Sequence, residues 1–103
     1  MASTLGYLQN VLSALPQTPD ITYKRMMGEY IIYYRSKVIG GIYDDRFLVK
    51  PTKGAKNLIP TAELAEPYPG AKPMLHITDL ENSALLYDLL ETLYADLPSP
   101  KRN

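Results

Sequence analysis

Two features of this sequence have residue types that could do chemistry. His76 is the only histidine, and Asp44 and Asp45 are the only adjacent acids. A catalytic or metal-bound imidazole needs an orienting carboxylate or further ligands, and the chain has no second histidine and no cysteine. Adjacent acids at a turn both face water. We therefore expect the aspartates to form a turn, and we expect no catalytic residue, metal site or cofactor.

Tyrosines interleaved with basic residues are a third feature. The segment 21–50 holds five of the nine tyrosines, together with several Lys and Arg residues. Proteins that bind single-stranded nucleic acid combine aromatic stacking with positive charge in this way. However, 11 basic and 11 acidic residues give the chain a net charge of zero, which is a poor electrostatic footprint for a nucleic-acid binder. We do not expect direct DNA binding by this chain alone.

The zero net charge conceals an uneven distribution. Residues 24–56 carry eight basic and three acidic side chains, whereas residues 79–96 carry five acids and no base. Either the two segments are neighbours whose exposed charges attract weakly, or each segment presents its own face to a partner. Both readings are compatible with the sequence.

Length and composition indicate one domain in a reducing compartment. The chain has 103 residues, 46% of them hydrophobic, which is enough for one core. The absence of cysteine excludes disulfides and thiolate sites. The N-terminus lacks the basic region of a signal peptide, and no run approaches the ~20 apolar residues of a spanning helix. We expect a cytoplasmic protein that does not contact a membrane.

Leucine spacing predicts two helices. The first covers residues 4–15, begins at Ser3 or Thr4 as N-cap, and buries a stripe of leucines. The second follows Thr78 and Glu81, which have capping-box spacing, with Asp79 as the alternative cap. Its leucines occupy one contiguous arc, so we expect this helix to bury a wide face. The leucines of the first stripe are Leu5, Leu8, Leu12 and Leu15.

The segment between the helices predicts a sheet. β-branched and aromatic residues broken by short turn signals indicate a four-stranded meander, and a fifth strand follows a long loop. The meander covers residues 21–27, 29–35, 38–43 and 46–50, the loop residues 51–72, with one helical turn at 61–66, and the fifth strand residues 73–78. Met26 and Met27 are expected to fill the core. Gly40 and Gly41 weaken their strand but let a tyrosine ring or a helix come close.

The predicted fold class is therefore α+β, with an antiparallel sheet of about five strands (the four-stranded meander plus one) packed with N- and C-terminal helices. Because both faces of the strand at 29–35 are mostly apolar or aromatic, we expect neighbours on both of its sides and a partial cover on its second face.

The ordered elements resemble a known family. The stretch KRMMGEYIIYYRSKVIGGIYDDRFLVK, followed by YPGAKPMLHI and a leucine-rich helix, is similar to the N-terminal domain of the TfoX/Sxy bacterial competence regulators. The resemblance covers about residues 4–97. In the family, Arg is usual at the position of Lys24, Phe is common at that of Met27, and a second Gly is frequent at that of Glu29. The residues that take the places of the family pattern are Lys24, Met26, Met27, Gly28, Tyr30, Asp45, Lys50, Lys72 and Met74.

The resemblance implies a secretion-chaperone-like α+β domain whose sheet curves around helices. It also implies an accessory role in the transcription of DNA-uptake genes alongside the cyclic-AMP receptor protein, with no established catalytic residue. The full-length regulators carry a second, helical domain. We expect this chain, residues 1–103, to be a stand-alone N-terminal-like domain that is ordered over about 4–97 and has a tail at 98–103.

The leading functional expectation is a non-enzymatic interaction or regulatory module that binds another protein, or a second copy of itself as a homodimer. The alternative is a small-ligand-binding or enzymatic domain with residues 51–72 as a lid. The candidate interaction surface consists of Lys24, Arg25, Tyr33, Arg35, Lys37, Arg46 and Lys50.

Overall fold

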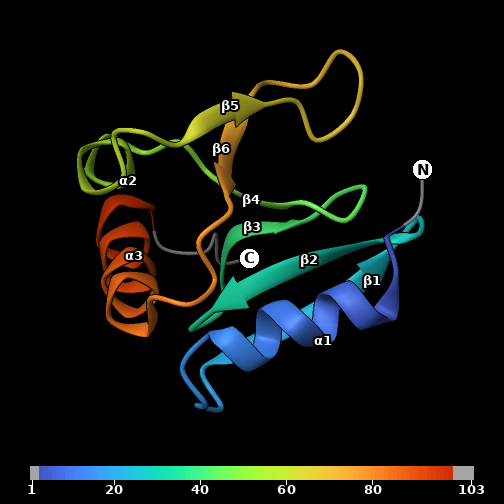
Figure 1. Cartoon of the computed structure of the whole chain (residues 1–103), viewed down its shortest axis with the longest axis horizontal. Helices are drawn as coiled ribbons and strands as arrows, with labels where there is room; N and C mark the ends of the chain where they lie inside the picture. Colours follow the sequence, from blue (N-terminus) through green and yellow to red (C-terminus); the bar gives the residue numbers. More distant parts are fainter. Residues whose placement is uncertain (1–2, 99–103) are drawn as a thin grey trace.

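Leucine-rich and β-branched segments alternate along the chain to give three helices and six strands over residues 3–98, the part that the computed structural model describes (Figure 1). The predicted tail at 98–103 lies, apart from Pro98, outside the described residues. In chain order the elements are α1 (Leu5–Ala14), β1 (Ile21–Met26), β2 (Glu29–Tyr34), β3 (Lys37–Ile42), β4 (Phe47–Val49), α2 (Lys53–Leu58), β5 (Glu63–Ala65), β6 (Met74–Ile77) and α3 (Ser83–Asp96).

The strands form one antiparallel sheet in the order β1-β2-β3-β4-β6-β5. The α+β class, the four-stranded meander and the strand after the long connection are confirmed, and β2 has a strand on each side, as predicted. The sheet has six strands because β5 adds to β6 at one edge. The two edge strands of the sheet are therefore β1 and β5.

Three two-residue turns build the meander. Their central residues are Met27–Gly28, Arg35–Ser36 and Asp44–Asp45, and all six have positive φ, from 50° to 84°. Type I′ turns need positive φ at both central positions, and their twist matches that of the flanking strands. Asp44 and Asp45 thus have the predicted turn role, since Tyr43 and Arg46 exchange backbone hydrogen bonds of 2.9 and 3.0 Å around them.

All three helices contribute to a core on one face of the sheet, which we call the helix face. Figure 1 shows α1 running alongside β1 and β2, while α2 lies next to α3. The predicted leucine arc of α3 is confirmed, because Leu86, Leu89, Leu90 and Leu93 are fully buried. The α1 stripe is only partly confirmed. Leu8 and Leu15 are buried, but Leu5, the first residue of the helix, is 53% exposed.

The opposite face, which we call the second face, has an aromatic cover. A Cβ atom added to Gly41 would lie 2.9 Å from Cε2 of Tyr43, so the Tyr43 ring crosses this glycine, as the sequence predicted for a tyrosine. Leu48 pairs with Gly41 and therefore shares this face, yet it is fully buried. The chain after β5 also folds toward this side, where Arg46 Nη2 donates to the Glu66 carbonyl oxygen at 3.0 Å and Pro67 is buried.

The prediction of a loop over residues 51–72 is wrong in two places. Thr52 caps α2 by accepting a hydrogen bond from Ala55 N at 3.2 Å, and α2 packs against α3. Residues 61–66, expected to make a helical turn, instead contain β5, which pairs with β6. A three-residue strand is stabilised mainly by its partner strand, so its own sequence carries little signal.

The start of α3 also differs from the prediction. Asn82 is the N-cap, and its Oδ1 accepts a hydrogen bond from Leu85 N at 3.1 Å. Asp79 instead makes a local turn, in which its Oδ1 accepts from Glu81 N at 3.1 Å. At the other end of the chain, Thr4 is the N-cap of α1, which is one of the two predicted residues.

Replacing Gly41 by alanine tests the close packing on the second face. The new Cβ would lie 2.4 Å from the Tyr30 carbonyl oxygen and 2.9 Å from the Tyr43 ring, so strand or ring must move. We expect Gly41→Ala to lower the free energy of unfolding by about 1–3 kcal/mol, measured by urea denaturation.

Gly6 supplies the matched control. A Cβ there meets no atom within 4 Å, and the residue lies in α1. Gly6→Ala should leave stability unchanged or raise it by up to about 1 kcal/mol. Equal unfolding midpoints for Gly41→Ala and wild type would contradict the proposed packing.

Candidate interaction surface

The seven residues predicted to form an interaction surface do not lie in one patch. Lys24 and Arg25 are exposed on β1 and point to opposite faces of the sheet. Tyr33 and Lys50 are half-buried. The other three residues, Arg35, Lys37 and Arg46, are engaged in contacts within the protein.

Lys37 stabilises the end of α3. Its Nζ donates hydrogen bonds to the carbonyl oxygens of Tyr94 and Leu97, at 2.7 and 2.8 Å. These carbonyls are in the last turn and at the C-cap of the helix, where intrahelical donors are missing and a positive charge is favourable. The same Nζ lies 4.0 Å from the centroid of the Tyr94 ring, which adds a cation–π contact.

Arg35 lies between two acids. Its Nε is 3.2 Å from Asp20 Oδ2, and its Nη2 is 3.4 Å from Glu91 Oε2. Glu91 also accepts a hydrogen bond from the Tyr34 hydroxyl. Burial raises the pKa of Tyr34, and the hydrogen bond to Glu91 raises it further, to about 12. The basic middle and the acidic end of the chain are thus neighbours at this point, in agreement with the first of the two readings.

Arg46 forms hydrogen bonds that connect the chain after β5 to the β3–β4 turn. Its Nε donates to the Tyr43 carbonyl oxygen at 3.1 Å, while its Nη2 reaches the Glu66 carbonyl oxygen. Burial raises the pKa of the Tyr43 hydroxyl. This part of the predicted surface therefore acts as a cover for the sheet rather than as a free basic patch.

The exposed part of the predicted surface is the outer strand β1 with its turn, which we call the basic edge (residues 21–27). Lys24 and Arg25 lie here beside three large apolar side chains that are well exposed: Tyr23 by 48%, Met26 by 47% and Met27 by 96%. The prediction of Met26 and Met27 as core residues is wrong, because Met27 occupies a type I′ turn that projects from the sheet. The sequence feature that indicates this turn is the Met-Gly pair between two strand-like segments.

The other edge of the sheet has the opposite charge. The segment that we call the acidic edge (residues 63–66) presents the exposed acids Glu63 and Glu66, and Leu64 between them is 56% exposed. Sequence reasoning missed this edge because it assigned residues 61–66 to a helical turn.

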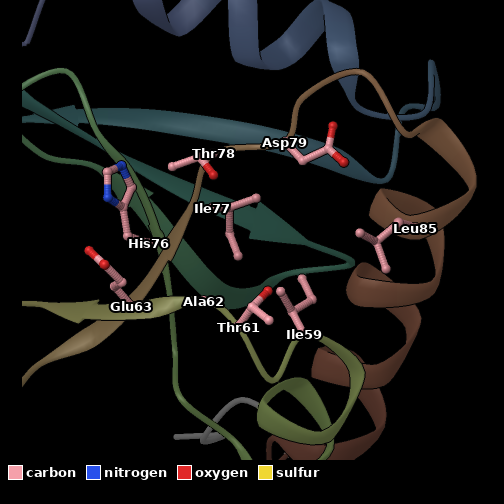
Figure 2. A pocket seen from close by; sticks show the side chains of 9 residues that line it. All are labelled: Ile59, Thr61, Ala62, Glu63, His76, Ile77, Thr78, Asp79 and Leu85. Carbon is pink, nitrogen blue, oxygen red and sulfur yellow. The ribbon is translucent and has the colours of Figure 1, made fainter.

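A cavity of about 430 Å³ lies where β5 begins and β6 ends (Figure 2). His76 and Glu63 lie next to each other as cross-strand neighbours. On the other side of β6, Ile77 faces Ile59 and Leu85. Over residues 3–98, no three His, Asp or Glu side chains are grouped so that they could hold a metal ion. The remaining lining residues are Thr61, Ala62, Thr78 and Asp79.

A protein of Spirochaeta aurantia, described as an uncharacterised 12.7 kDa protein in the trpE 5′ region, is similar to this chain. The two are 35% identical over 102 residues, which cover 98% of this chain and 89% of that protein. This chain belongs to the family of that 12.7 kDa protein. No family model matches the sequence, and no solved structure matches it. The family relationship thus spans all the described elements, and the resemblance to TfoX/Sxy stays a prediction.

None of the helices described in residues 3–98 has the length and apolar content needed to cross a membrane.

The contact between Tyr34 and Glu91 predicts a stability change at alkaline pH. The pKa of Tyr34 is about 12 in the folded protein, compared with 10.0 for an unperturbed tyrosine, so the folded state holds the hydroxyl proton more tightly. The resulting stabilisation is complete below pH 10 and is lost as pH rises through 12. We expect the free energy of unfolding to fall less steeply over this range in Tyr34→Phe than in wild type.

Glu91→Gln provides a second test, because it removes the hydrogen bond and the negative charge that raise the pKa of Tyr34. In urea denaturation between pH 9 and the alkaline limit of folding, the pH dependence of its stability should lie between those of wild type and Tyr34→Phe. If wild type and Tyr34→Phe have the same pH dependence, Tyr34 does not carry the predicted effect.

Proposed function

We propose that this protein is a non-enzymatic, cytoplasmic interaction module that resembles the N-terminal domain of TfoX/Sxy regulators, and that the basic edge is the surface that contacts its partner. The observation that carries this proposal is the exposure of Tyr23, Met26 and Met27 beside Lys24 and Arg25. The partner is a protein, and an accessory role in transcription regulation follows from the resemblance alone.

The chemistry of the basic edge supports a protein partner. An edge strand offers backbone donors and acceptors to an incoming strand. Large apolar and aromatic side chains next to positive charges are typical of the residues that dominate protein interfaces. Lys24, Met26, Met27 and Gly28 are also among the positions that carry the resemblance to the TfoX/Sxy pattern.

The disposition of charge supports a protein partner rather than DNA. Arg35 is paired with two carboxylates, and Lys37 and Arg46 donate to backbone carbonyl oxygens, so these three cations are engaged within the chain. Affinity for DNA depends on basic side chains that are free to contact phosphates. Together with a net charge of zero, this supports a role in which any link to transcription passes through another protein.

The alternative, a small-ligand-binding or enzymatic domain, is supported by the cavity beside His76 and Glu63. Ile59, Thr61, Ala62 and Glu63 line it, so part of the segment predicted as a lid does contact the cavity. However, α2 fixes the start of this segment on α3, where Gly54 N donates to Asp96 Oδ2 at 2.9 Å, and β5 fixes its middle. A ligand of this site would have to fit a cavity with ordered walls.

Thermal unfolding in the presence of small metabolites tests the alternative. A ligand that occupies the cavity should raise the unfolding temperature of wild type in proportion to its concentration. The shift should disappear in Thr61→Trp, which adds a large side chain at an exposed position of the cavity wall, and persist in Met27→Gly, which is remote from the cavity. Metabolites that stabilise none of the proteins, or all of them equally, would count against the alternative.

Quantitative pull-down tests the proposed function. Met26→Gln combined with Met27→Gly removes the exposed apolar side chains, and glycine suits the φ of 54° at position 27. We expect the doubly substituted protein to lose at least tenfold in capture of the partner from a lysate of the source organism, as for a central interface contact.

Tyr87→Gln is the matched control, since Tyr87 is 49% exposed on α3, which Figure 1 shows at the opposite end of the molecule from the β1–β2 turn. It should capture the partner as wild type does. A partner that binds wild type and both variants equally would show that the basic edge is not the contact surface.

A further inference from the structure

The two edge strands of the sheet, β1 and β5, have directions that would let β1 of one copy pair with β5 of a second copy. Each pair of neighbouring strands is antiparallel, so along the order β1-β2-β3-β4-β6-β5 the directions alternate and β1 runs opposite to β5. A second copy in the same orientation would therefore bring its β1 antiparallel to β5 of the first. Such a junction would continue the sheet without changing its pattern.

The register of the sheet shows which residues would meet. On the second face, successive cross-strand partners run in one row from Lys24 at one edge to Glu63 at the other. The row is Lys24, Ile31, Gly41, Leu48, His76 and Glu63. If a second copy continues this row, its Lys24 lies directly opposite Glu63 on the same face.

The adjacent row lies on the helix face and ends in two apolar residues. It is Tyr23, Ile32, Gly40, Val49, Leu75 and Leu64. In the register that pairs Lys24 with Glu63, Tyr23 of one copy lies opposite Leu64 of the next. These residues are 48% and 56% exposed, and both would lose water-accessible apolar surface in the junction.

We propose that the basic edge of one copy adds to the acidic edge of a second copy, with Lys24 opposite Glu63 and Tyr23 opposite Leu64. This inference rests on the proposed function, because it names a second copy of the chain as a partner of the basic edge. A single register thus pairs opposite charges on the second face and apolar side chains on the helix face.

Charge favours this head-to-tail junction over a symmetric one. Two basic edges would bring Lys24 and Arg25 of each copy together, and two acidic edges would do the same for Glu63 and Glu66. Like charges on paired strands are destabilising. The head-to-tail junction leaves a free edge at each end, so association continues to open chains or closes in a ring.

The junction is short, since β5 has three residues. Association should therefore need a high protein concentration, and it should weaken as added salt screens the pair of opposite charges. Sedimentation velocity over a concentration series at low and high ionic strength measures both properties. Species larger than a dimer are expected at the highest concentration.

Charge reversal provides the decisive test. Lys24→Glu and Glu63→Lys should each sediment as a monomer under conditions where wild type associates, because each variant places like charges opposite one another. An equimolar mixture of the two variants should associate again, since every junction between unlike copies then pairs opposite charges. Lys53→Glu, a charge reversal at an exposed position of α2, should associate as wild type does.

Three results would overturn the proposal: monomeric wild type throughout the series, association of Lys24→Glu equal to that of wild type, or a mixture that stays monomeric. Monomeric wild type combined with capture of another protein through the Met26 and Met27 side chains overturns self-association and leaves the proposed function intact. Association that is lost in the single variants and restored in the mixture supports the proposal, whatever the pull-down finds. Circular dichroism of each variant confirms that it is folded.

Discussion

The packing of the Tyr43 ring across Gly41 is the contact on which the arrangement of the sheet depends. All three helices contribute to a core on the helix face, so the second face needs a cover of another kind. A side chain at position 41 would collide with the Tyr30 carbonyl oxygen and the Tyr43 ring, whereas glycine lets the ring pack closely against β3. The ring and the chain near Pro67 then allow Leu48 to be fully buried without a helix above it.

This aromatic cover supports the expectation that the tyrosine-rich meander does not bind nucleic acid. A stacking surface needs rings that are free on one face, but Tyr30 and Tyr34 are buried and Tyr43 is half-buried. The basic side chains that accompany them contact carbonyl oxygens and carboxylates of the same chain. Charges and rings that look like a binding surface in sequence therefore hold α3 and the chain after β5 against the sheet.

Elements with a strong local pattern could be predicted, and those fixed by long-range pairing could not. The leucine period of α3 and the apolar strands of the meander are properties of contiguous residues, so their spans agree with the structure to within a few residues. β5 has an exposed leucine between an acid and an alanine and exists because β6 lies beside it. The exposed Met27 was likewise missed, because residue type suggested the core while the turn conformation decided its place.

Charge at the basic edge has two physical effects that reinforce each other. Lysine and arginine on an edge strand disfavour pairing with an identical strand, which is one of the ways proteins avoid edge-to-edge aggregation. The charge of Lys24 favours a strand that carries an acid opposite it, and β5 has Glu63 at that position in the proposed register. Oppositely charged edges thus disfavour symmetric pairing and favour directional pairing. The zero net charge of the chain conceals this asymmetry, which becomes visible only when strand order and register are known.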